Sequence, residues 1–144
     1  MNYAIMILEI LIDNICYTFN NRHKTATIVN ADHCCKSTEI NIPEKVIYEG
    51  VEYKVTKIGI YAFSYCNALQ SVVIPDGVTS IGEYAFFNCN SIRNFTLGVG
   101  VSTIGNYAFD WCESLQSVTI PDSVTSIGMG AFRNCTSLKD VYCM

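Results

Sequence analysis

A phrase of nine residues recurs four times in this chain at a spacing of 23 residues, with no insertion between copies. The copies read IGIYAFSYC, IGEYAFFNC, IGNYAFDWC and IGMGAFRNC, and they begin at Ile58, Ile81, Ile104 and Ile127. A unit that repeats at one fixed length is a supersecondary piece that buries its apolar face by stacking on its neighbours. The period therefore predicts a solenoid, which offers a partner surface and not an enclosed pocket.

The stretch between two phrases has the alternation of a strand with one face inward. In the first unit Leu69, Val72 and Ile74 are the inward positions, and Pro75 closes the strand because it lacks an N–H. The matching inward residues of the later units are Ile92, Phe95 and Leu97, then Leu115, Val118 and Ile120, then Leu138, Val141 and Cys143. Each unit thus begins with a short strand and a turn.

A second short β segment follows the turn, with Val78, Val101 and Val124 inward, and each copy ends at the glycine of the IG pair. A glycine fixed at that place indicates a positive φ angle or a close backbone approach. The Ala, Phe and Cys that come next lie four, five and eight residues after the leading Ile, which fits one or two turns of helix with Phe and Cys buried. The unit is therefore predicted to be strand, turn, short strand and short helix.

Residues 1–57 do not repeat and are predicted to form a β-rich cap on the first unit, because the ends of an open solenoid need covering. Hairpins are expected from 15–19 to 25–29 and from 46–48 to 53–56, with a strand at 39–42. The apolar run 4–12 contains Glu9, has no preceding Lys or Arg and no small-residue cleavage site, so it is a poor signal peptide. A strand, or a gene start placed inside a longer reading frame, fits this run better.

Four of the eight cysteines, namely Cys66, Cys89, Cys112 and Cys135, lie at one place in the repeat. Cys packs as a small hydrophobe, so this column is predicted to consist of buried thiols. Neighbouring copies are expected to be kept too far apart for disulfides by the packing distance of the helices, about 8–10 Å.

Composition and motifs argue against several function classes. A net charge of −4 with a pI near 5.0 and no basic stripe speaks against nucleic acid as a partner. No apolar run reaches the roughly 18 residues of a membrane helix, so membrane insertion is not expected. The cluster His33-Cys34-Cys35 lacks the spacing of a zinc site and is a poor Cys–His pair, although a disulfide from Cys34 to Cys16 stays open. No phosphate loop is present, and we expect no catalytic residue, cofactor or metal.

The strand motif L-x-x-V-x-I resembles a leucine-rich repeat, and the unit resembles the BspA-like group, whose consensus runs close to LxxVxIPxxVTSIGxxAFxxCxS. The match spans residues 58–144 as four tandem copies, the last incomplete. Gly98 for proline and Gly130 for Tyr are among the local departures. The resemblance implies an α/β solenoid, a right-handed superhelix, and a role in adhesion or host or matrix contact at the cell surface or after secretion. It also implies that partners dock on a concave strand face.

Two candidate surfaces follow from the repeat. The first is the strand face, formed by the outward strand positions: Gln70, Ser71, Val73, Arg93, Asn94, Thr96, Gln116, Ser117, Thr119, Lys139, Asp140 and Tyr142. The second is an aromatic stripe on the helical side: Tyr61, Tyr84, Tyr107 and Trp111, with Tyr65 nearby. Aromatic residues are enriched at interfaces, but a tyrosine ladder also serves to cover a thin core.

We therefore expect a non-enzymatic module that binds a protein or glycan ligand. The alternative is a structural spacer or assembly segment of a larger repeat protein, with no ligand of its own. The chain stops directly after a strand, inside a unit, so the last repeat is expected to be uncapped and open to self-association.

Overall fold

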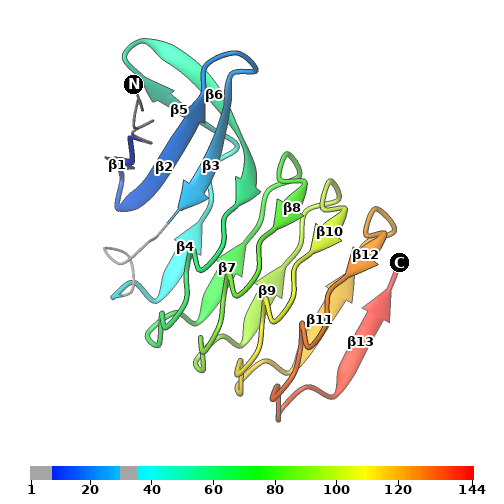
Figure 1. Ribbon diagram of the computed structural model, residues 1–144. Coiled ribbons are helices and arrows are strands. Elements are labelled where there is room, and N and C mark those ends of the chain that lie inside the picture. The colour runs from blue at the N-terminus through cyan, green and yellow to red at the C-terminus, as the bar shows by residue number, and fades with distance from the viewer. Residues whose placement is uncertain (1–7, 30–35) are drawn as a thin grey trace, which may run out of the picture.

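The computed structural model describes residues 8–29 and 36–144 and shows a chain wound into stacked coils (Figure 1). Each coil contributes one strand to each of two sheet faces. On one face lie β6 (Val51–Ile58), β8 (Ser80–Ile81), β10 (Thr103–Ile104) and β12 (Ser126–Ile127), which pair in parallel in this order. On the other lie β4 (Glu39–Asn41), β7 (Ser71–Val73), β9 (Asn94–Thr96), β11 (Ser117–Ile120) and β13 (Asp140–Cys143). The solenoid is confirmed, while the right-handed sense of its coil stays a prediction.

The N-terminal strands extend the first face. β1 (Ile10–Ile12) pairs with β2 (Ile15–Asn20), and β2 with β3 (Thr25–Val29), each antiparallel. β3 then pairs in parallel with β6, while β5 (Lys45–Tyr48) forms a hairpin with β6. The expected hairpins are therefore present, and the C-terminal part of the run 4–12 is a strand. Residues 4–7 of that run lie outside the described part of the chain.

A ladder of side-chain hydroxyls reinforces the first face. Thr79 Oγ1 donates to the carbonyl of Thr56 at 3.2 Å, Ser102 Oγ to that of Thr79 at 3.0 Å, and Thr125 Oγ1 to that of Ser102 at 3.2 Å. The backbone amides of the same three residues donate to the same carbonyls. This double use of one carbonyl per coil explains why the repeat keeps Ser or Thr at this place.

Within residues 8–29 and 36–144 no helix is present, so the expected short helix after each IG pair is a wrong prediction. The segments 60–65, 83–88, 106–111 and 129–134 are runs of turns. In the first run, the amides of Tyr61, Phe63 and Tyr65 donate to carbonyls of the next coil at 2.7–3.0 Å, and those of the residues between them close turns within the coil. We call this side of the coils the turn edge.

Coil spacing explains why a helix is absent. Paired strands lie about 4.8 Å apart, whereas packed helices need about 8–10 Å between axes. Because both faces of each coil pair as strands, one helix per coil has no room. The turn edge is spaced as closely as the strands, and the concavity that the resemblance implies for the strand face stays a prediction.

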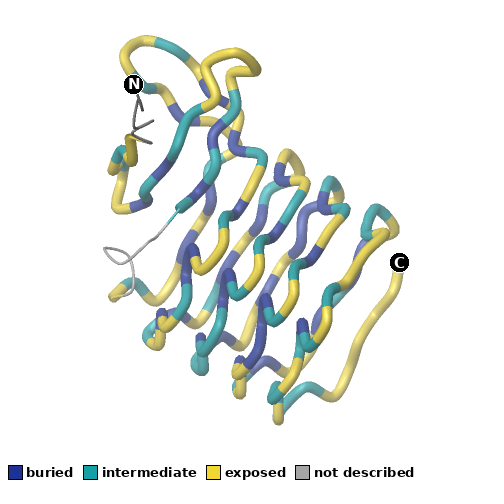
Figure 2. The backbone as a smooth tube through the Cα atoms, in the orientation of Figure 1, coloured by how far each residue is buried: buried dark blue, intermediate teal, exposed yellow. Residues whose placement is uncertain are grey.

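The core is a stack of four phenylalanine rings, one from each coil. The ring centroids of Phe63, Phe86, Phe109 and Phe132 follow one another at 5.1, 5.3 and 5.1 Å, with the rings near parallel. The first three are fully buried, and Phe132 in the last coil is partly exposed. Figure 2 shows buried residues recurring from coil to coil and exposed ones along the final strand.

The glycines of the IG pairs permit the close approach of one coil to the next. A Cβ built on Gly82 would lie 2.7 Å from the carbonyl carbon of Gly59, and one on Gly105 would lie 2.6 Å from the amide nitrogen of Glu83. Neither glycine has a positive φ angle. Of the two reasons foreseen for these glycines, close approach is therefore the correct one.

Truncation of one ring in the middle of the stack should be costly. We expect Phe86→Ala and Phe109→Ala each to lower the free energy of unfolding by about 3–5 kcal/mol, because both rings are fully buried and stacked on two sides. Phe132→Ala is the matched control, since its ring is partly exposed and stacks only on Phe109. Urea unfolding followed by circular dichroism measures the three losses, and equal losses would contradict the central role of the stack.

Candidate functional site

The strand face carries the twelve outward residues expected there. Pairing aligns Ser71 with Asn94 and Val73 with Thr96, and Ser117 with Asp140 in the second block of strands. All twelve side chains are exposed except Ser71 and Thr119, which are half-buried. The columns predicted from the repeat are therefore real within each block, and their role in binding stays a prediction.

Between the two blocks the columns are interrupted, because β9 pairs with β7 and β11 pairs with β13, but β9 and β11 do not pair. Phe95 in β9 stands where the neighbouring coils carry Val72 and Val118. Its ring lies edge-on against Phe86 at 5.2 Å and Phe109 at 4.5 Å. This larger ring in the core gives a physical reason for the break, which sequence spacing alone does not reveal.

The strand face begins one coil earlier than the sequence analysis placed it. β4 pairs in parallel with β7, so Glu39 lies opposite Ser71 and Asn41 opposite Val73, and both new residues are exposed. The sequence does hold a signal for them. The stretch INIP around Asn41 matches VVIP and VTIP of the repeats.

The aromatic stripe lies on the turn edge. The rings of Tyr61 and Tyr84 stack at 4.9 Å, and those of Tyr84 and Tyr107 at 5.1 Å. All three residues have left-handed backbones, with φ between 55° and 56°, and Gly130 holds the same place in the last coil with φ 61°. A left-handed backbone suits glycine and costs free energy at a bulky residue. The tyrosines are thus kept at a place where glycine fits with less strain.

Trp111 belongs to a second column of the turn edge and not to the tyrosine stack. It shares one place in the repeat with Tyr65, Asn88 and Asn134, and all four have φ between 57° and 63°. Tyr65 is 57% exposed and Trp111 42%. Tyr65 and Trp111 both border a surface depression of about 370 Å³, which we call the turn-edge groove.

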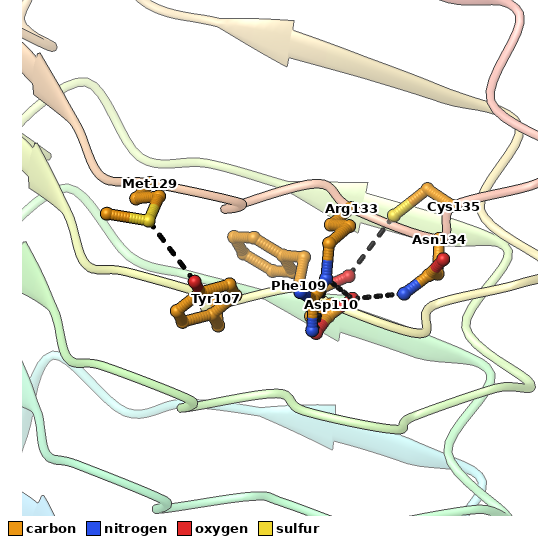
Figure 3. A network of polar contacts seen from close by, with 7 residues as sticks. All are labelled: Tyr107, Phe109, Asp110, Met129, Arg133, Asn134 and Cys135. Atoms are coloured by element: carbon orange, nitrogen blue, oxygen red, sulfur yellow. Dashed lines mark hydrogen bonds and ion pairs between the residues drawn. The ribbon is translucent and has the colours of Figure 1, made fainter.

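A buried carboxylate joins the third and fourth coils at the same edge (Figure 3). Asp110 is fully buried and accepts hydrogen bonds from Arg133 Nη2 at 2.6 Å and from Asn134 Nδ2 at 3.0 Å. The bond to Asp110 raises the pKa of the Arg133 guanidinium, which also lies 4.8 Å from the centroid of the Tyr107 ring. Tyr84 stacks on one side of the Tyr107 ring, and Arg133 covers the other side, where Gly130 supplies no ring.

Sequence analysis did not single out Asp110 and Arg133. Both occupy the variable place after the AF pair, 23 residues apart, where the first two units have Ser64 and Phe87. Opposite charges at one repeat position in adjacent units are the signal that could have found them. The contact is a clip between coils, since the carboxylate is fully enclosed and its hydrogen bonds are made within the protein.

The cysteine column is a hydrogen-bonded ladder. Cys89 Sγ lies 3.0 Å from the carbonyl oxygen of Phe63, Cys112 Sγ 3.3 Å from that of Phe86, and Cys135 Sγ 3.1 Å from that of Phe109. The expectation that helix packing keeps the cysteines apart is wrong, because no helix is present at these segments of the described chain. Instead each thiol donates to the coil before it. Burial raises the pKa of Cys112, and raises that of Cys135 to about 11.

Chemistry elsewhere is sparse. In the described ranges 8–29 and 36–144, no three His, Cys, Asp or Glu side chains gather as a metal site, and no helix is long and apolar enough to cross a membrane. His23 is exposed in the turn before β3. The cluster His33-Cys34-Cys35, and with it the disulfide considered from Cys34, lies outside the described residues.

The repeat matches a known family. The family model described as BspA type leucine rich repeat region (6 copies) matches residues 56–144. The chain belongs to the BspA-type leucine-rich repeat family. A leucine-rich repeat protein of Bacteroides capillosus has a similar structure, with a TM-score of 0.85 and 33% identity over 94% of this chain and 98% of that one.

Two other solved structures that resemble this chain are of longer proteins. A leucine rich cell surface protein of Faecalibacterium prausnitzii is 32% identical, with a TM-score of 0.71, over 95% of this chain and 43% of that one. The pneumococcal vaccine antigen PcpA is 22% identical, with a TM-score of 0.79, over 96% and 38%, and this likeness shows the fold alone. No curated protein matches the chain.

The cysteine ladder predicts a loss of stability at alkaline pH. The folded state keeps the thiol of Cys135 protonated up to about pH 11, whereas the ordinary pKa is 9.0, so the unfolded chain releases its protons first. The free energy of unfolding should therefore be intact below pH 9.0 and fall as pH rises towards 11. Urea titrations under reducing conditions should show a shallower fall for Cys112→Ala/Cys135→Ala. Tyrosine ionisation affects the wild type and the double variant alike. If the free energy of unfolding falls equally steeply with pH in the two proteins, the prediction is contradicted.

Proposed function

We propose that this protein is a non-enzymatic binding module that presents its strand face to a protein or glycan ligand in adhesion or in host or matrix contact. The observation that carries the proposal is the strand face itself, where hydrogen-bonded strands hold exposed polar side chains at fixed spacing. Such a surface is rigid before binding, so little conformational entropy is lost on association. Its mixed polar character favours shape and hydrogen bonding over attraction between net charges.

The similar proteins support a leucine-rich repeat module at the cell surface, without indicating a particular ligand. The family is one of leucine-rich repeat proteins, and the Faecalibacterium prausnitzii relative is described as a cell surface protein. We propose a surface or secreted location for this chain on that basis. Because the chain spans 43% of that relative, the activity of the whole relative is not carried over.

Substitution on the strand face tests the proposal. Arg93→Ala/Thr96→Ala should abolish capture at the strand face, whether of immobilised matrix proteins or of glycans on an array, because it removes one donor and one hydroxyl from the middle of the face. Lys57→Ala is the control, since Lys57 is an exposed cation on β6 of the opposite face. Equal capture by the wild-type protein and the double variant would count against the strand face.

A second candidate function is assembly, and the last coil favours it. Ile127 is 48% exposed and Val141 55%, whereas their counterparts Ile104 and Val118 in the preceding coil are 2% exposed. β12 and β13 each end their sheet, so their outer backbone groups are open to another strand. We propose that a second copy, or a further coil, stacks here. In that case the protein acts as a spacer or assembly segment and has no ligand of its own.

Sedimentation equilibrium tests this assembly. The wild-type protein should associate as its concentration rises, and Val141→Glu should weaken association at least tenfold, because it places a carboxylate in the apolar end of the stack. Thr119→Glu is the control, adding the same charge to the outward side of β11. A wild-type protein that stays monomeric at every concentration would overturn self-association.

A further inference from the structure

The turn-edge groove combines aromatic and amide side chains. Its lining residues in the described chain are Tyr65, Phe87, Asn88, Asn90, Trp111 and Glu113, and its volume is about 370 Å³. Tyr65 and Trp111 come from the first and third coils, so they stand two coil spacings apart, about 10 Å. The intervening coil contributes Phe87, whose ring meets that of Tyr65 edge-on at 5.3 Å.

Backbone strain falls on both aromatic residues that flank this groove, as it does on the tyrosine stack of the same edge. The column of Tyr65 and Trp111 requires a left-handed backbone in all four coils, and Asn88 and Asn134 fill the other two places. Asparagine tolerates this conformation, whereas a bulky aromatic residue is strained there. Tyr65 and Trp111 are both exposed, so burial does not offset the strain. Strained residues of this kind gather at functional sites, and here both lie at one groove.

We propose that the turn-edge groove binds a neutral oligosaccharide. Aromatic faces carry partial negative charge and attract the polarised C–H groups of a sugar ring. Asn88 and Asn90 supply amide donors and acceptors, and Glu113 supplies a carboxylate, which together match the hydroxyls at the rim of a sugar. The aromatic residues Tyr65 and Trp111 stand far enough apart to contact two sugars of one chain. The groove shares no residue with the strand face, so this proposal adds a second binding surface and goes beyond the proposed function.

Charge in the groove argues against ionic ligands. None of the six described lining residues is a cation, and Glu113 is an anion, so a phosphate, sulfate or acidic sugar would meet repulsion. A quaternary ammonium would suit the aromatic rings and Glu113, but it cannot form a hydrogen bond with the amides of Asn88 and Asn90. A sugar hydroxyl both donates and accepts hydrogen bonds and satisfies amide and carboxylate together.

The single tryptophan of the chain provides a direct readout, because Trp111 lies in the groove. We expect titration with short cello-, chito- and manno-oligosaccharides to shift the fluorescence of Trp111 for at least one series, and the array to show capture of the same series. Calorimetry should then show at least tenfold weaker binding for Tyr65→Asn and for Trp111→Asn. Both variants should be as stable as the wild type or more so, because they install the residue found at this place in the second and fourth coils.

Tyr61→Ala is the matched control, since Tyr61 is a comparably exposed tyrosine with a left-handed backbone outside the groove, and it should bind as the wild type does. No fluorescence shift with any series, or equal binding by the Asn variants, overturns the proposal. A shift with choline alone, or matrix-protein capture that is lost in the Asn variants while sugars do not bind, also overturns it. Capture that depends on Arg93 and Thr96 but not on Tyr65 leaves the proposed function standing without this groove.

Discussion

The distance from one coil to the next is the constraint on which the rest of this structure depends. Parallel strands, continuous on one face and interrupted on the other only between β9 and β11, hold successive coils at about 4.8 Å, and every other element has to fit that interval. Phenylalanine rings fit because flat rings stack at 5.1–5.3 Å. Glycine fits at the IG pairs because a Cβ there would collide with the preceding coil. Cysteine fits because its thiol reaches the carbonyl of the previous Phe.

The same interval explains how far the sequence could be interpreted. Alternation with a period of two identified the inward residues of the strands, and identical spacing of the Phe residues indicated one shared interior. The spacing of Ala, Phe and Cys after each IG pair fits a short helix as well as it fits a run of turns. Periodicity alone therefore could not distinguish these two structures. The left-handed backbones at Tyr61 and Tyr84 could not be predicted either. Only the last unit has glycine, the residue that this conformation favours, at the same place, as Gly130.

Variation between the units is concentrated at the turn edge. The two places after each AF pair read Ser-Tyr, Phe-Asn, Asp-Trp and Arg-Asn, while the surrounding residues stay nearly constant. One of these places builds the clip between Asp110 and Arg133, and the other builds the aromatic sides of the turn-edge groove. Stacking fixes the backbone at these places but leaves their side chains free to differ. Individual pairings of this kind depend on which coils are neighbours, and so a consensus cannot predict them.

The hydrogen bonds of the turn edge give the solenoid an electrical direction. In each coil three amides point towards the following coil and three carbonyls point back, whereas amides and carbonyls alternate in direction along a strand. Their peptide dipoles therefore add along the stack, as they do along the axis of a helix. The last coil displays the positive end of this array at Gly130, Phe132 and Asn134, where a carbonyl-rich or anionic neighbour is favoured over one that presents amides.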